Sequence, residues 1–266
     1  MSQSLSTLLA LISEGETPEA VSLSNDILDR SRSTEERDHL IEARVRMERA
    51  LLGAIGEENI GTELRWCVDR LNAICPGSPL HGLALLNLAI WHSNKGEQMM
   101  ARAVHSDIST NSGHPDDIRA LSRWEIARIL VGMGDLDPAM RHLWSARNGF
   151  IDSEMSPEAL VTSLEWLNIA LDEVSSNAPT METRIEEASP REGPGNTWIP
   201  ANPDDITNVV EYLLPILTAD LSGHSRSDLG LIIDASEIIG RSDWTSGMAD
   251  RISEIQDPMV LESLQS

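Results

Sequence analysis

The sequence has few cationic residues and almost no lysine. Its 266 residues include 20 Lys and Arg against 43 Asp and Glu, a formal net charge of −23, and the one lysine is Lys95. A polyanion is repelled by phosphate backbones and by anionic lipid surfaces. Because no run of basic residues offsets this charge, the composition argues against direct binding to nucleic acid or to a membrane surface.

Cysteines and long apolar runs are also scarce. Cys67 and Cys75 are too few for a disulfide framework, and on one helix they would lie about 12 Å apart, beyond disulfide reach. The apolar stretch 8–12 is too short for a secretory signal, and no run approaches the roughly 20 apolar residues of a membrane span. We therefore expect a protein of the reducing cytoplasm.

Known catalytic and metal-binding motifs are absent from the sequence. It has no Gly-x-Ser-x-Gly elbow, no Walker loop and no Gly-x-Gly-x-x-Gly turn. No two histidines have the i, i+4 spacing of a helix-borne zinc site, and Cys67, Cys75 and His81 match no known ligand spacing. The pairs 116–117 and 204–205, both Asp-Asp, fit the first turns of helices, where negative charge is favoured. We expect no catalysis, no metal and no cofactor.

The sequence does contain a repeat with a period near 40 residues. Glycines recur at intervals of 41, 40 and 38 residues, at Gly15, Gly56, Gly96 and Gly134. An acidic residue follows each glycine, and a small residue stands five positions after it: Ala20, Gly61, Ala101 or Ala139. Glycine can adopt φ > 0 and end a helix, the acid favours the start of the next helix, and the small residue lets two helices approach closely. The period predicts stacked pairs of helices.

Two segments carry this pattern most fully. They run from Leu83–Ala89 to Gly96-Glu97 and Ala101, and from Leu121–Ala127 to Gly134-Asp135 and Ala139. Both resemble tetratricopeptide repeats, although the period exceeds the usual 34 residues of that family and Arg49 stands where the family has a small residue. The resemblance covers residues 1–176. It implies an all-α fold, a right-handed α-α superhelix of about four to five helix pairs.

The chain departs from the repeat after residue 176. Residues 177–203 are rich in Pro and Gly, which predicts a linker or a long loop. Short helices are expected in the last part of the chain, near residues 204–221, 227–240, 243–256 and 258–264, with Pro215 kinking or splitting the first. We expect residues 204–266 to cap the open end of the stack, because a solenoid must cover its last apolar face. A separate small helical subdomain is the alternative.

The resemblance also implies where a partner would bind. In the family, the first helix of each pair lines a concave surface that binds peptides. Carried over to this sequence, the groove would consist of Arg46, Leu86, Asn87, Ile90, Trp124 and Arg128. Apolar surface beside arginines suits an extended or helical peptide with acidic residues. The alternative for Trp124 is burial against the neighbouring repeat.

Asn87 also matches one residue of the clamp with which some family members hold a terminal carboxylate. The other clamp positions hold Ala50, Leu121 and Glu125, so the clamp is incomplete and we expect no binding of this kind. The leading hypothesis is an adaptor or scaffold that binds a peptide or partner protein. The alternatives are a regulatory or sensory module that works with a transcription or signalling partner, and an unrecognised enzyme subunit.

Overall fold

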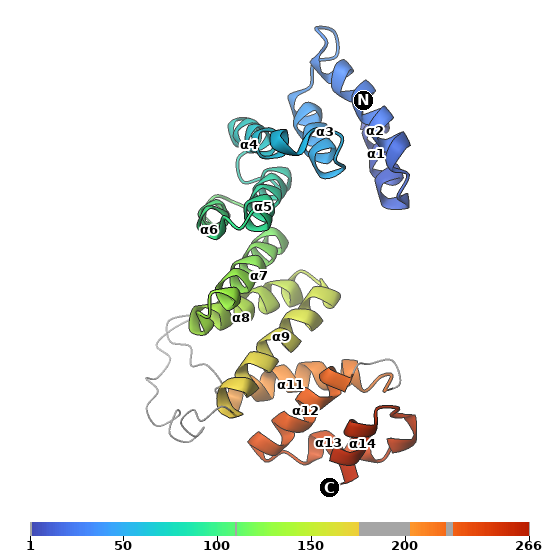
Figure 1. Cartoon of the computed structure of the whole chain (residues 1–266), viewed down its shortest axis with the longest axis vertical. Helices are drawn as coiled ribbons and strands as arrows, with labels where there is room; N and C mark the ends of the chain where they lie inside the picture. The colour runs from blue at the N-terminus through green and yellow to red at the C-terminus, as the bar shows by residue number, and fades with distance from the viewer. Residues whose placement is uncertain (1, 110, 176–202, 222–225, 266) are drawn as a thin grey trace. The chain divides into compact units, whose positions relative to one another are not determined.

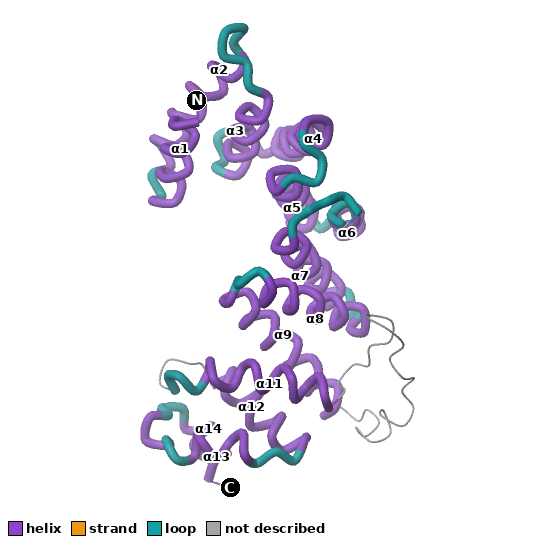
Figure 2. The backbone as a smooth tube through the Cα atoms, turned by 180° about the vertical axis from the view of Figure 1, so that it is seen from behind, coloured by secondary structure: helices purple, strands orange, loops and turns teal. Residues whose placement is uncertain are grey.

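The computed structural model describes residues 2–109, 111–175, 203–221 and 226–265. Their regular secondary structure is helical and includes no strand (Figure 2). The predicted all-α class is therefore confirmed. The predicted linker, residues 177–203, lies outside the described residues except for Pro203, which begins a helix.

The described ranges consist mostly of helices. In chain order they are α1 (Ser2–Glu14), α2 (Thr17–Arg32), α3 (His39–Leu51), α4 (Glu57–Ile74), α5 (Pro79–Asn94), α6 (Gln98–Ser106), α7 (Asp116–Gly132), α8 (Leu136–Asp152), α9 (Ser156–Ser175), α11 (Pro203–Leu217), α12 (Arg226–Ile239), α13 (Asp243–Ala249), the 3₁₀ helix η1 (Ile252–Glu254) and α14 (Pro258–Gln265). Figure 1 shows these helices with their labels. They form two compact units, residues 1–129 and 130–266, and the division falls inside α7.

In the first unit, each helix packs on the next in the chain. Contacts join α1 to α2, α2 to α3, α3 to α4, α4 to α5 and α5 to α6, and α1 also touches α3. Successive helices that pack in chain order are what a stack of helix pairs requires. The predicted helical repeat is thus confirmed in the arrangement of the described helices.

The same hydrogen bond closes the turn inside each pair. It runs from a backbone N–H to the carbonyl oxygen five residues earlier: Glu16 to Leu11 (3.0 Å), Ala54 to Arg49 (3.0 Å), Glu97 to His92 (2.9 Å) and Asp135 to Leu130 (3.0 Å). The residue before each donor is a glycine with φ between 67° and 79°, at position 15, 53, 96 or 134. This is the Schellman motif, in which glycine ends a helix at a left-handed conformation.

One of the four predicted turn glycines was wrong. Gly56 has a φ of −61° and is the N-cap of α4, whereas Gly53 has a φ of 67° and ends α3. The connection between these two helices is longer than in the other pairs, so the regular spacing pointed to the glycine at its far end. Glu57 still lies in the first turn of α4, as predicted for the acid.

The small residues after the turns are where helices come close. Ala20, Ala101 and Ala139 are fully buried. A Cβ atom on Gly61 would overlap the indole ring of Trp91, so α4 has no side chain at the point where this ring of α5 packs against it. The period therefore marks tight helix contacts, as the repeat predicts.

Arg49 departs from the small-residue pattern because it bonds to the preceding helix. Its guanidinium donates to Ser24 Oγ (3.1 Å) and to the side-chain oxygen of Asn25, which both belong to α2. A polar link between α2 and α3 thus replaces a close apolar contact. Such a link adds a charge-assisted hydrogen bond in a half-buried place.

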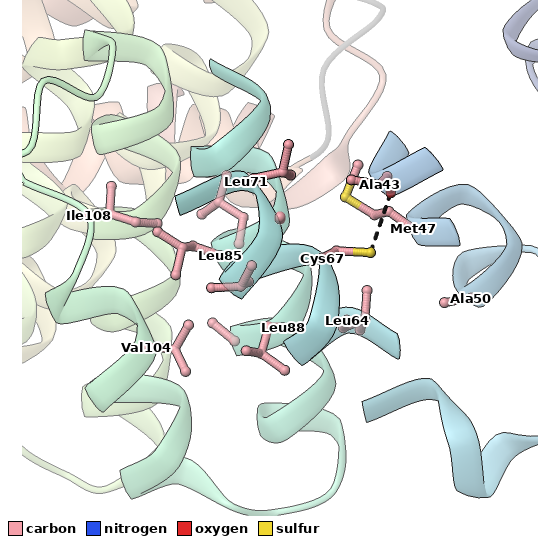
Figure 3. Packing of buried hydrophobic residues seen from close by; sticks show 14 of the residues in the cluster. Ala43, Met47, Ala50, Leu64, Cys67, Leu71, Leu85, Leu88, Val104 and Ile108 are labelled. Carbon is pink, nitrogen blue, oxygen red and sulfur yellow. Dashed lines mark hydrogen bonds between the residues drawn. The ribbon is translucent and has the colours of Figure 1, made fainter. Parts of the chain in front are cut away.

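The core of the first unit contains two clusters of apolar side chains. One joins α1, α2 and α3, and the other joins α3 to α6 and reaches Ile118. Figure 3 shows the second cluster, in which Cys67 donates from Sγ to the carbonyl oxygen of Ala43 (3.3 Å). Burial, assisted by the charge of Glu63, raises the pKa of the Cys67 thiol to about 12. A thiol that holds its proton so firmly is a structural residue and not a nucleophile.

In the second unit, α8 and α9 form a hairpin, and α11 and α12 both pack against α9. The helices α13 and α14 in turn pack on α12. The predicted capping role of residues 204–266 stays a prediction, and these contacts are the ones it needs. Helix α11 continues through Pro215 and ends two residues later at Leu217, so the proline does not split the helix.

Candidate binding cleft

A cleft of about 380 Å³ opens in the first unit. Its lining is formed by Leu5, Leu40, Ile41, Arg44, Pro79, Leu80, Leu83 and Ile118. These residues belong to α1, α3, α5 and α7, the first helices of four successive pairs, and most lie near the starts of their helices. Seven of the eight side chains are apolar, so the cleft offers apolar surface to a guest.

Helix caps position two walls of the cleft. The Asp38 carboxylate accepts the backbone N–H groups of Leu40 (3.0 Å) and Ile41 (3.0 Å), so α3 begins with two cleft residues held in place. Ser78 Oγ accepts the N–H of His81 (3.2 Å), and Pro79 occupies the first position of α5. Both arrangements are standard N-terminal caps, each of which stabilises a helix by about 1 kcal/mol.

A glycine allows α5 and α7 to approach each other under the cleft. A Cβ atom on Gly82 would lie 2.6 Å from Cγ2 of Ile118 and 3.1 Å from Cδ2 of His114. Real Cβ atoms essentially never come as close as 2.6 Å to another carbon, so the absence of a side chain at position 82 lets Ile118, a lining residue, pack against α5. The starts of the two helices are held at this spacing.

The one ionisable residue in the cleft lining is Arg44. Its Nε lies 2.6 Å from a carboxylate oxygen of Glu48, one turn along α3. This ion pair is mostly buried, so the arginine is already neutralised before any guest enters. A single titratable group gives the cleft no acid–base pair for catalysis.

The residues predicted for the groove lie elsewhere on these helices. Leu86 is only 4% exposed and belongs to the core cluster, because its face of α5 packs against the neighbouring helices. Asn87 is half-buried and Ile90 is exposed, further along α5 than the cleft residues. None of the three lines the cleft.

Arg46 is engaged inside the protein. Its guanidinium lies 2.9 Å from Glu63, 3.2 Å from Glu42 and 4.0 Å from the centroid of the Trp66 ring. Burial alone would raise the pKa of Glu42, but the hydrogen bond from Arg32 and the charges of Arg46 and Arg32 together lower it. Arg46 thus joins α3 to α4 and does not line the cleft.

Trp124 and Arg128 do lie together, one turn apart on α7. The Arg128 guanidinium is 5.2 Å from the centroid of the Trp124 ring and 3.7 Å from the Glu125 carboxylate. Trp124 is half-buried, and the Arg128 side chain is 57% exposed. Neither belongs to the cleft lining, and a contact of this pair with a partner stays a prediction.

The cleft residues carried a sequence signal that the groove prediction did not use. Leu40, Ile41 and Leu80 are apolar residues in the first turn of a helix, two or three positions after its N-cap. Ile41 also belongs to one core cluster and Leu80 packs against the other, so the cleft borders the core at these first turns.

Four first helices line one cleft, and one glycine turn recurs inside the pairs. The fold of the described residues is a tetratricopeptide-like helical repeat. Among solved structures, the chain is similar to a Podosopora anserina putative kinesin light chain with nearly identical TPR-like repeats. The two share 12% sequence identity with a TM-score of 0.48, over 84% of this chain and 91% of that chain. No family model and no curated protein matches the sequence.

No described helix is both long and apolar enough to cross a membrane. No group of three or more His, Cys, Asp or Glu side chains in the described ranges is arranged to hold a metal ion.

Proposed function

We propose that the protein is an adaptor whose cleft accepts an apolar segment of a partner protein. The observation that carries this proposal is the cleft itself, in which four helices from successive pairs present seven apolar side chains around a single neutralised arginine. When a guest covers the apolar lining of the cleft, each Å² of apolar surface removed from water stabilises the complex by about 25 cal/mol. Two or three apolar side chains of a peptide would fill the volume.

The charges favour a partner segment with neutral or cationic flanks. The expectation of an acidic peptide relied on free arginines, but Arg44, Arg46 and Arg128 each lie beside a glutamate. The net charge of −23 attracts cationic segments and repels acidic ones. The guest is therefore an apolar anchor flanked by Lys or Arg.

Replacing Leu40 with arginine tests the cleft. Leu40 lines the cleft and is 41% exposed, so the substitution places a charge at the mouth without removing a core side chain. Peptides selected from a random displayed library on the full chain should lose at least about tenfold in affinity, which corresponds to about 1.4 kcal/mol. Fluorescence anisotropy of labelled peptides measures the Kd.

The matched control is Leu51→Arg. Leu51 lies on the same helix, α3, is 54% exposed and does not line the cleft, so this variant should bind like the wild type. Equal affinity of both variants for every selected peptide would refute the cleft as the binding site. The double variant Trp124→Ala/Arg128→Glu tests the predicted groove. If this variant loses binding and Leu40→Arg does not, the partner binds at α7 and not in the cleft.

The volume of the cleft supports a second candidate, a sensory module with a small ligand. About 380 Å³ falls within the range of 300–1,000 Å³ that small-molecule sites occupy. Thermal-shift screening of metabolites against the wild type and Leu40→Arg separates the two functions. A compound that stabilises only the wild type, together with an empty peptide selection, would favour the sensory module.

A further inference from the structure

Two buried histidines, one at the start of α5 and one just before α7, lie against each other. His81 lies in the first turn of α5, and His114 lies two residues before α7. The Nδ1 atom of His81 and the Nε2 atom of His114 are 3.2 Å apart, and the two rings are stacked with their centroids 5.2 Å apart. Both side chains are buried.

The backbone around the pair determines which nitrogens carry protons. Gly77 N–H donates to His81 Nδ1 (3.2 Å), so this nitrogen is an acceptor. His114 Nε2 must then carry the hydrogen that it donates to His81. Ser109 N–H donates to His114 Nδ1 (3.4 Å), which is therefore also an acceptor. Both rings are thus neutral, and a proton added to either Nδ1 would face a backbone N–H instead of an acceptor.

The surroundings make protonation of the pair costly. Burial lowers the pKa of His81, and the nearby His114 lowers it further, whereas Asp107 acts in the opposite direction. Burial also lowers the pKa of His114, against the effects of Ser109 and Asp107. The folded pKa values thus lie below the unfolded value of about 6.5, so the unfolded chain binds more protons in this range. The stability that the neutral pair contributes is complete above about pH 6.5 and is lost as the pH falls from there through the folded pKa values.

The pair adjoins residues that line the cleft. His81 directly follows Leu80 and precedes Leu83, and Ile118 comes one turn after His114. The side chains of Ile118 and His114 are also the two that a Cβ atom on Gly82 would meet, so the segment before α7 and its first turn both pack against the start of α5. A displacement of His114 from α5 therefore disturbs the contact by which Ile118 is held there.

We propose that protonation of the His81–His114 pair separates the starts of α5 and α7, and that the cleft thereby loses its shape and releases its guest in mildly acidic solution. The release of a guest rests on the proposed function. The opening of the wall does not, because it concerns only residues of this chain.

Hydrogen exchange followed by mass spectrometry tests the opening on the full chain. After correction for the intrinsic rates, residues 77–83, 107–109 and 111–118 should exchange at least about tenfold faster at pH 5.5 than at pH 7.5, a factor that corresponds to about 1.4 kcal/mol in the free energy of opening. The double variant His81→Asn/His114→Gln should respond less than about twofold. In this variant an amide oxygen can accept at the position of His81 Nδ1, and an amide nitrogen can donate at the position of His114 Nε2, but neither group titrates.

The matched control is His105→Asn. His105 is a buried histidine of α6, and its Nδ1 lies 3.0 Å from Ser122 Oγ on α7. This variant should keep the acid response. Equal exchange of the wild type at the two pH values would overturn the proposal, as would a full response in the double variant or a lost response in His105→Asn. If the double variant does not fold, imidazole titration by NMR decides instead: the proposal requires that both rings of the wild type titrate below pH 6.5 together with shifts of Leu83 and Ile118.

Binding supplies the second measurement. A selected peptide whose affinity is lost in Leu40→Arg should bind the wild type at least about tenfold more weakly at pH 5.5 than at pH 7.5, and the double variant should bind it equally at both. An acid response in exchange with no such peptide in the selection would contradict the proposed function and leave the opening established. An unchanged affinity in acid would contradict the release.

Discussion

Replacement of Arg147 with methionine should destabilise the second unit by about 1–3 kcal/mol, the cost of leaving buried polar groups without their hydrogen-bond partner. The Arg147 side chain is 3% exposed on α8, and its Nε donates to Ser163 Oγ of α9 (3.0 Å). Its guanidinium lies 5.0 Å from the ring centroid of Tyr212 on α11. Burial lowers the pKa of Arg147, whereas Tyr212 and the buried carboxylate of Asp205 raise it. Three helices therefore meet at one cation.

The measurement is a urea titration of the full chain. Hydrogen exchange assigns the transition that belongs to residues 130–266, because two compact units need not unfold together. The double variant Arg147→Met/Asp205→Asn should recover part of the loss, since it leaves no buried charge unpaired. Arg128→Met, which changes an arginine that is 57% exposed, should stay within about 0.5 kcal/mol of the wild type. A loss below about 1 kcal/mol in Arg147→Met would show that the cation does not hold these helices together.

The turns of the repeat could be predicted because they depend on local chemistry. A glycine at the end of a helix and an acid at the start of the next act within a few residues of each other, so Gly15, Gly96 and Gly134 were identified from spacing alone. At the remaining turn the prediction chose Gly56, but Gly53, three residues earlier, is the glycine that ends α3. Spacing cannot choose between two glycines of one loop.

The cleft could not be located in the same way. Helix α5 is apolar around much of its circumference, so its sequence does not tell which leucines face the core. Leu83 lines the cleft and Leu86, three residues later, is buried, although the two side chains are chemically identical. Contacts between distant residues had no local signal either: Arg147 and Tyr212, whose guanidinium and ring lie together, are 65 positions apart. Only the packing of whole helices decides these positions.

Gly77→Ala should lower the free energy of unfolding of the first unit by at least about 3 kcal/mol, although it adds only one methyl group. Gly77 has a φ of 72°, a conformation that costs other residues about 1–2 kcal/mol. A Cβ atom here would also overlap the backbone carbonyl oxygen of Ser112, which cannot rotate away as a side chain can. The loop that carries Ser112 would have to move, and with it the Gly77 N–H that donates to His81. The urea midpoint of the transition that unfolds residues 1–129 measures the loss.

Gly113→Ala separates the cost of a positive φ from the cost of the overlap with Ser112, because alanine at position 113 has the positive φ without any overlap. Gly113 has a φ of 82°, and a Cβ atom there would meet nothing within 4 Å. This variant should therefore lose only about 1–2 kcal/mol. The difference between the two variants is the free energy with which the loop beside Ser112 is held against the start of α5. Equal losses would mean that this loop moves aside freely, and the histidine pair that depends on the same contact could not then hold the cleft wall in place.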